Sequence, residues 1–171
     1  MTPMFDRRQK INLACALVCA GMLGYAIFYA ERVLGYQPCP LCMFQRVCIG
    51  ALGLVFLVAG LHRARYRGAI VYAIFIFLAA SAATWVAGRH VWIQHQPPGT
   101  VPSCGAPLDN LLQMFPVLEV IRKVMTGGGE CGNVDWTMLG ISMPGWVLIA
   151  AVSLGLIGIV NNAVYPVRAR R

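Results

Sequence analysis

Four long apolar stretches constrain this chain more than any other feature of its sequence. They cover residues 11–30, 43–61, 69–88 and 144–164, and each has roughly the ~20 residues that a helix needs to cross ~30 Å of hydrocarbon. With 58% hydrophobic and 12% charged residues, the chain is too apolar for an ordinary soluble domain. The sequence therefore predicts an all-α membrane protein, a four-transmembrane-helix bundle that forms one integral domain over residues 1–171.

The second stretch differs from the others in its length. Its charge-free part, residues 47–61, gives only about 22 Å of helix at ~1.5 Å per residue. To span a bilayer, this helix must also take in the residues near Cys42, Gln45 and Arg46. Arg46 is thereby drawn to membrane depth near one interface, where an arginine is costly and usually functional. A snorkelling interfacial arginine is the alternative.

Basic residues predict the orientation of the spans. The segments before span one, between spans two and three, and after span four hold nine basic residues and one acid: Arg7, Arg8, Lys10, Arg63, Arg65, Arg67, Arg168, Arg170, Arg171 and Asp6. By the positive-inside rule, both termini are cytoplasmic and the loops at about 31–42 and 89–143 are extracytoplasmic. The positive charge thus reflects membrane topology, and no nucleic-acid partner is expected. The first apolar run is longer than the core of a cleaved signal peptide, so we interpret it as an uncleaved anchor.

The seven cysteines fall into two groups. Cys39 and Cys42 follow the first span, and Cys104 and Cys131 lie in the long polar loop, all on the predicted oxidising side where disulfides persist. The other three, Cys15, Cys19 and Cys48, lie within apolar runs, where free cysteine usually packs as a small hydrophobe. The four loop cysteines are therefore the candidates for redox or metal-binding chemistry.

The Cys39-Pro-Leu-Cys42 motif has three interpretations, which are half a zinc site, a structural disulfide and a redox pair. Zinc needs four ligands, and Cys104, Cys131 or His95 could complete the set, but the spacings match no zinc-ribbon pattern. No metal is therefore expected. A redox pair is favoured because Cys42 would lie in the first turn of span two, where the helix dipole favours a thiolate.

Three further residues are candidate ligands of a lipid-dissolved electron acceptor such as a quinone. Arg46 lies one helical turn after Cys42 and could stabilise its thiolate or bind a quinone carbonyl. Gln45 could also hydrogen-bond a ligand, although it could equally be a solvated interface residue. His90, at the end of span three, could donate to a quinone oxygen or be satisfied by water. His62 belongs to the cytoplasmic turn and is expected to be structural.

The long loop contains two features that suit cysteines which exchange partners. Prolines 97, 98 and 102 precede Cys104 and predict an extended, mobile chain. Glycines 127–129 form a hinge just before Cys131. Between them, residues 108–124 predict a short amphipathic helix bent at Pro116. This helix lies on the membrane surface or packs against residues of the loop itself.

The chain closely resembles the disulfide bond formation protein B family (DsbB). The resemblance covers essentially the whole chain and rests on the Cys-x-x-Cys with an arginine four residues later, the distant cysteine pair, and the Trp-x-x-Leu-Gly and Met-Pro-x-Trp motifs. The matching residues are Cys39, Cys42, Arg46, Cys104, Cys131, Trp136, Leu139, Gly140, Met143, Pro144 and Trp146. Gln45 departs from those family members that have glutamate there.

The resemblance implies a thiol:quinone oxidoreductase of the bacterial inner membrane. Its partner would be a periplasmic DsbA-like thiol oxidase, and its cofactor ubiquinone or menaquinone from the membrane pool. The implied relay begins with attack of the partner on a Cys104–Cys131 disulfide at Cys104, after which Cys131 attacks Cys39 of a Cys39–Cys42 disulfide.

Two other functions remain as alternatives. One is a four-helix membrane scaffold whose loop is stapled by structural disulfides, which leaves Arg46 and the glycine hinge without a purpose. The other is an enzyme of the vitamin K epoxide reductase type, in which the redox motif usually lies near the end of a later span. Quinone reduction by a thiol partner would discriminate among the three.

Overall fold

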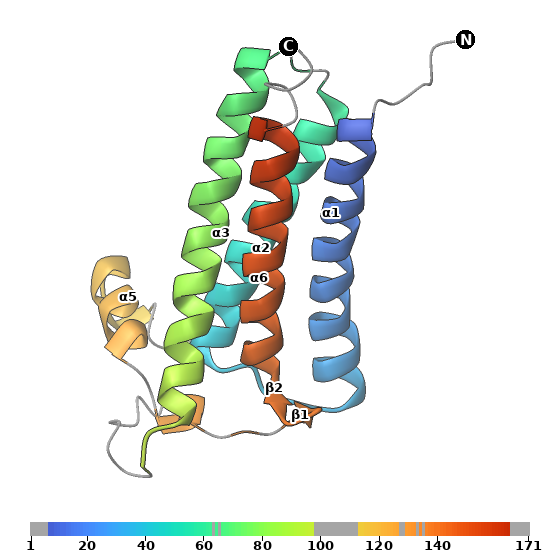
Figure 1. The fold of residues 1–171 in the computed structure, drawn as a ribbon. Helices are drawn as coiled ribbons and strands as arrows, with labels where there is room; N and C mark the ends of the chain where they lie inside the picture. Colours follow the sequence, from blue (N-terminus) through green and yellow to red (C-terminus); the bar gives the residue numbers. More distant parts are fainter. Residues whose placement is uncertain are drawn as a thin grey trace.

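The structure is a computed structural model that describes residues 7–62, 64, 66–97, 113–126, 129–132, 134 and 136–164. Its helices are α1 (Arg7–Gly24), η1 (Tyr25–Val33), α2 (Pro40–Leu61), α3 (Tyr66–Gln94), α5 (Val117–Thr126), η2 (Gly129–Gly132), α6 (Met143–Ile159) and η3 (Val160–Val164). The α1–η1 helix, α2, α3 and the α6–η3 helix are long and apolar enough to cross a membrane, and they run side by side as a bundle (Figure 1). The predicted four-helix membrane bundle is confirmed.

The helices extend beyond the predicted spans. The first continues as a π-helix to Val33, and the third reaches Gln94 instead of residue 88. The second begins at Pro40, three residues before its predicted start, because proline is well tolerated at the first helical position. The first predicted loop thus shrinks to residues 34–39. Apolar composition marks where hydrocarbon ends, whereas backbone hydrogen bonding continues past charged residues such as Arg89.

Small residues let the helices approach closely in the core. A Cβ placed on Gly53 of α2 would lie only 2.8 Å from the Cβ of Cys19 on α1, and one on Gly158 of α6 would lie 2.7 Å from side-chain atoms of Phe56 and Ile76. Close contact between small residues is how transmembrane helices gain van der Waals packing without a hydrophobic driving force. Cys19 and Cys15 are buried in this core, consistent with the packing interpretation.

A buried amide cluster ties the first helix to the last at the end of the bundle where α1 begins and η3 ends (Figure 1). The Asn12 Nδ2 donates to Asn162 Oδ1 over 3.1 Å, and Asn161 and Asn162 each donate to Asn12 Oδ1 over 3.0 Å. All three side chains are buried, so the unpaired amides would be costly in hydrocarbon. The cluster keeps the α1–η1 helix in register with α6.

The helix α5 lies beside α3, outside the bundle (Figure 1). Its Val120 and Val124 are buried against Leu41, Ile93 and Cys131, while Leu118 remains 80% exposed. Of the predicted helix over residues 108–124, the described part bends at Phe115 and Pro116 as expected. It packs on the bundle as well as on the loop, and its other side leaves an apolar face uncovered.

A two-stranded hairpin leads into the last span. The strands β1 (Thr137–Met138) and β2 (Ile141–Ser142) are antiparallel, with Thr137 opposite Ser142. Leu139 and Gly140 have φ angles of 54° and 76°, as a two-residue type I′ turn requires. The Trp146 Nε1 donates to the Met138 carbonyl over 3.2 Å. The Leu-Gly and Met-Pro-x-Trp motifs therefore build this turn and the start of α6.

Candidate functional site

The Cys-x-x-Cys motif forms the N-terminus of α2. Cys39 is the N-cap residue, Pro40 occupies the first turn, and the Cys42 backbone N–H donates to Cys39 Sγ over 3.3 Å. The two sulfur atoms lie 2.9 Å apart, in hydrogen-bond contact and not in a bonded pair. Both side chains are half-buried. The cap therefore brings the two thiols within reach of a disulfide and places them where the helix dipole stabilises negative charge.

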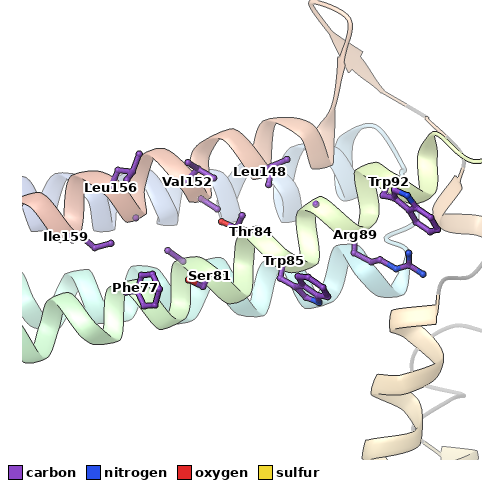
Figure 2. A pocket seen from close by; sticks show the side chains of 14 residues that line it. Phe77, Ser81, Thr84, Trp85, Arg89, Trp92, Leu148, Val152, Leu156 and Ile159 are labelled. Carbon is purple, nitrogen blue, oxygen red and sulfur yellow. The ribbon is translucent and has the colours of Figure 1, made fainter.

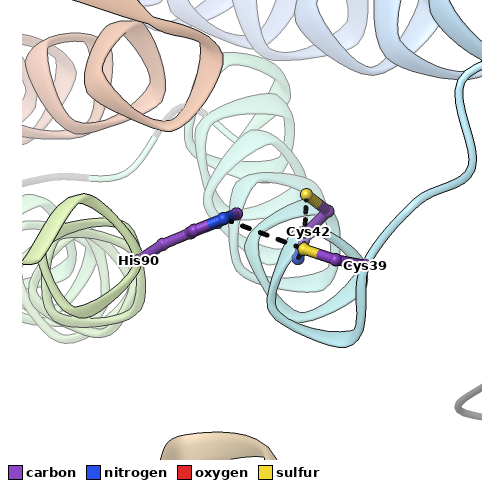
Figure 3. A group of neighbouring side chains, drawn as sticks. All are labelled: Cys39, Cys42 and His90. Atoms are coloured by element: carbon purple, nitrogen blue, oxygen red, sulfur yellow. Dashed lines mark hydrogen bonds between the residues drawn. The ribbon is translucent and has the colours of Figure 1, made fainter. Parts of the chain in front are cut away.

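His90 approaches this pair from α3 (Figure 3). Its Nε2 lies 3.8 Å from Cys39 Sγ and 3.2 Å from the Cys131 carbonyl oxygen, and its Nδ1 lies 2.9 Å from Gln45 Nε2. His90 and Gln45 are both buried. The simplest assignment of the protons has Gln45 donating to Nδ1, which leaves the Nε2–H to donate to the carbonyl. Gln45 thus contacts His90 and is not a solvated interface residue.

Cys131, which belongs to η2, contacts the Cys39–Cys42 pair. It is 1% exposed, and its thiol hydrogen-bonds to Cys39. This hydrogen bond, followed by the one with Cys42 and by burial, raises the pKa of the Cys39 thiol well above its ordinary value. The fold therefore brings three of the four predicted redox cysteines together. Cys104 and glycines 127–128 lie outside the described residues.

Arg46 lies one turn after Cys42 and points toward η1. It forms an ion pair with Glu31, donates to the Ala26 carbonyl over 3.3 Å and contacts Met43 Sδ at 3.8 Å. The side chains of Arg46 and Glu31 are 17% and 26% exposed. The guanidinium is therefore anchored within the protein, in contrast to a snorkelling arginine.

Sequence reasoning did not identify Glu31. The sequence contains one indication of its role, because Glu31 is a single acid directly after a charge-free span, on the same predicted side of the membrane as Arg46. The spans give no indication of which helix faces meet, so the pair emerges only from the fold.

A cavity of about 880 Å³ joins these residues. Its walls come from the α1–η1 helix, the loop before α2, α2, α3, the hairpin and α6. The polar and sulfur-containing side chains that line it include Met22, Tyr25, Glu31, Tyr36, Gln37, Cys39, Cys42, Gln45, Arg46, His90, Gln94, Met138 and Met143. Trp136 and Trp146 also line it, as interfacial tryptophans do at the ends of spans. The rest of the lining is mostly apolar, so the cavity suits a ligand with an apolar body and a few polar atoms.

A second cavity, of about 660 Å³, lies between α3 and α6 (Figure 2). Its lining includes Phe77, Trp85 and Leu156, with Arg89 and Trp92 at one end. The Arg89 guanidinium lies over the Trp92 ring at 4.2 Å from its centroid. None of the described residues that line this cavity has a thiol or an imidazole.

The remaining candidates lie apart from the site. Cys48 is half-buried and packs both against the core that contains Cys19 and Phe56 and against the buried group that contains Leu41 and Ile93. The His95 Nδ1–H donates to the Val91 carbonyl over 2.8 Å and its side chain is exposed. His62 pairs with Tyr72 over 2.7 Å, just after the end of α2 that lies opposite Cys39.

Comparison with known proteins adds independent information. The family model described as Disulfide bond formation protein DsbB matches residues 7–161. The chain is 46% identical over 144 residues to the disulfide bond formation protein B of Xylella fastidiosa (strain 9a5c), covering 84% of this chain and 83% of the relative. It is 47% identical over 141 residues to the protein of that name from Xanthomonas oryzae pv. oryzae (strain MAFF 311018), covering 82% and 81%.

Proposed function

Because the chain belongs to the disulfide bond formation protein B family, whose members are disulfide-generating membrane oxidoreductases, we propose that it is a thiol:quinone oxidoreductase. It would take electrons from a periplasmic DsbA-like thiol oxidase and pass them to membrane quinone, ubiquinone or menaquinone. The observation that supports this most is the contact of three thiols, Cys39, Cys42 and Cys131, at an apolar cavity near the end of the membrane spans.

The cavity fits a quinone headgroup. Its volume of about 880 Å³ lies within the ~300–1,000 Å³ of typical ligand sites. Arg46 would donate to one carbonyl oxygen, and the His90 Nε2–H would donate to the other in place of the Cys131 carbonyl, while Met143, Trp146 and their apolar neighbours would contact the ring. A bound quinone would supply the two-electron acceptor that returns Cys39 and Cys42 to the disulfide. Glu31 fixes the guanidinium, so Arg46 is oriented before a ligand arrives.

The relay begins at the loop disulfide. A thiolate of the partner attacks Cys104 Sγ, the Cys104–Cys131 bond breaks, and Cys131 leaves as a thiolate. The Cys131 thiolate then attacks Cys39 Sγ, the Cys39–Cys42 bond breaks, and Cys42 leaves as a thiolate. The hydrogen bond between the Cys131 and Cys39 thiols supports attack at Cys39, because exchange depends on which sulfur is accessible. The α2 N-terminus stabilises the negative charge that develops on Cys42.

The choice of acceptor follows from redox potentials. A DsbA-like oxidase has a potential of about −120 mV, and every ~30 mV is worth about 1.4 kcal/mol for two electrons. The glutathione pool lies well below −120 mV, so electrons from the partner would flow to it only uphill. A quinone has a potential high enough to accept them.

The proposed location is the bacterial inner membrane, with both termini in the cytoplasm. Arg7, Arg8 and Lys10 lie at the start of the first span and Arg67 at the start of the third, and α1 and α3 begin at the same end of the bundle (Figure 1). Cys39 and the hairpin lie at the opposite end, which the positive-inside rule assigns to the periplasm. Both cysteine pairs then face the oxidising compartment.

A turnover experiment tests the proposal. Purified protein in detergent is mixed with a reduced DsbA-like partner and a soluble quinone analogue, and quinone absorbance is followed. We expect catalytic loss of quinone that Cys39→Ser and Cys42→Ser abolish, while a Cys15, Cys19 and Cys48 triple alanine variant retains most of it. A wild-type protein that leaves both quinone and the partner's thiols unchanged would favour the structural-disulfide scaffold instead.

A further inference from the structure

We infer that the reduced form of this site binds one thiophilic divalent cation of the Zn²⁺ or Cd²⁺ class, with Cys39, Cys42, Cys131 and His90 as ligands. Such binding would make the cation a redox-gated inhibitor. The binding goes beyond the proposed function and requires only that the thiols be reduced, whereas its inhibitory effect rests on the proposed thiol exchange.

The donor atoms already lie at metal-site spacing. The two sulfurs of Cys39 and Cys42 and one ring nitrogen of His90 all lie within 4.8 Å of one another. Figure 3 shows the three side chains turned toward one another. In a tetrahedral site with Zn–S bonds of about 2.3 Å and a Zn–N bond of about 2.0 Å, two sulfurs lie about 3.8 Å apart and a sulfur and a nitrogen about 3.5 Å apart. The Cys39 Sγ to His90 Nε2 distance is 3.8 Å. The sulfurs of Cys39 and Cys42, at 2.9 Å, would separate by about 0.9 Å to reach the spacing of two sulfur ligands.

The fourth ligand is the Cys131 thiol. It hydrogen-bonds to Cys39, and its backbone carbonyl lies 3.2 Å from the same His90 nitrogen. A set of three cysteines and one histidine is a known structural zinc combination. The nitrogen and sulfur donors and the absence of carboxylates among these four residues favour Zn²⁺ or Cd²⁺ over Mg²⁺ or Ca²⁺.

The surroundings orient these ligands. The Cys42 backbone N–H donates to Cys39 Sγ over 3.3 Å and would stabilise a metal-bound thiolate there. Gln45 holds His90 through Nδ1 at 2.9 Å, and such contacts to the second ring nitrogen set the tautomer of metal-binding histidines. When the Nε2 lone pair faces a cation, Nδ1 carries the proton and the Gln45 amide oxygen can accept it, since the amide offers both a donor and an acceptor.

The redox state of the cysteines controls the site. A cysteine that is part of a Cys39–Cys42 or Cys104–Cys131 disulfide cannot supply a thiolate ligand. The full ligand set therefore exists only when both pairs are reduced. Binding then releases the three thiol protons and forms three metal–sulfur bonds, with no electron transferred. The bound thiolates cannot attack a disulfide or be reoxidised, so turnover stops until the cation leaves. The half-buried Cys39 and Cys42 line the 880 Å³ cavity, which offers an entry path.

Cadmium titration of the purified full-length protein tests this inference without quinone or partner. Protein reduced with a phosphine is titrated with Cd²⁺, and thiolate-to-cadmium absorption in the ultraviolet is recorded. We expect one Cd²⁺ per reduced chain, reversal by a chelator, and no such absorption for the oxidised protein. Equal binding to both redox forms, or none to the reduced form, would overturn the inference.

Variants identify the ligands. Cys39→Ser and Cys42→Ser should abolish tight binding, and Cys131→Ser should remove about a third of the absorption, as expected for one of three thiolates. Gln45→Leu should weaken affinity by about 10–100-fold, the usual effect of removing a contact to a metal ligand. Far-ultraviolet circular dichroism confirms that each variant is folded. The triple alanine variant of Cys15, Cys19 and Cys48 is the matched control, and loss of binding in it would contradict the assigned site.

Discussion

The Gln45 side-chain amide and the His90 ring nitrogen Nδ1 are 2.9 Å apart and buried, on two different membrane-spanning helices. This contact fixes the orientation of the imidazole ring, whose Nε2 faces Cys39 Sγ and the Cys131 carbonyl oxygen. Gln45 is a neutral amide, so this contact orients His90 without adding a formal charge beside it.

The first prediction concerns this contact. Gln45→Leu should leave the His90 Nδ1 buried without a partner, which costs about 1–3 kcal/mol, and should lower kcat/KM for quinone by roughly tenfold or more. Gln45→Glu replaces the amide donor by an acceptor, so the contact persists only when His90 carries a proton on Nδ1 as well as on Nε2, and this variant should recover part of that loss. Steady-state kinetics with varied quinone measure both variants. Equal activity of Gln45→Leu and the wild type would show that His90 needs no positioning.

The second prediction concerns the arginine. Arg46→Ala should raise the KM for quinone strongly, with little effect on binding of the thiol partner, because Arg46 lines the cavity but lies apart from Cys131. Arg46→Lys should recover only part of the affinity, since a point charge replaces a planar fork. Glu31→Gln should change KM in the same direction by a smaller factor, because it loosens the guanidinium without removing it. Normal quinone turnover by Arg46→Ala would assign Arg46 a purely structural role.

The third prediction concerns thiol reactivity. A raised pKa leaves Cys39 with a smaller thiolate fraction at neutral pH, and the thiolate is the form that alkylates. In the reduced protein, iodoacetamide should therefore modify Cys42 before Cys39, as measured by peptide mass spectrometry over time. Cys131→Ser removes the largest cause of the shift and should speed alkylation of Cys39. Chain unfolded in denaturant is the control, in which both rates should converge. Faster reaction at Cys39 in the folded protein would contradict the prediction.

The fourth prediction concerns the order of attack. A partner lacking its second active-site cysteine cannot resolve a mixed disulfide by itself, so it should accumulate as a covalent complex through Cys104. Cys131 should then be released toward Cys39, with which it is already in contact. Peptide mapping of the complex identifies the linkage. A partner joined to Cys131 or Cys39 would exclude the proposed relay, even if the protein reduced quinone.

The fifth prediction concerns topology. A reporter fused after Arg67 should be cytoplasmic and one fused after Thr126 extracytoplasmic, because the basic segments flank the cytoplasmic ends of the spans. Alkaline phosphatase and green fluorescent protein fusions measure the two sides. Fusions that report the same side would contradict the proposed orientation of the bundle.

The sequence by itself determined the elements and the local chemistry. Bilayer thickness sets the length of a span, so composition alone revealed four helices, and helix periodicity placed Cys42 and Arg46 one turn apart. Composition did not determine where the helices end, because α2 begins at Pro40 and α3 continues through a polar segment, both beyond the apolar runs.

Only the tertiary structure decided which residues meet. The approach of His90 to Cys39, the ion pair of Arg46 with Glu31 and the inward direction of Gln45 depend on the rotation and depth of each helix relative to its neighbours. Every face of a membrane helix can be apolar, so hydropathy does not encode that rotation. It is set by close packing, as at Gly53 and Gly158, and by buried polar contacts, and both exist only once the helices are assembled.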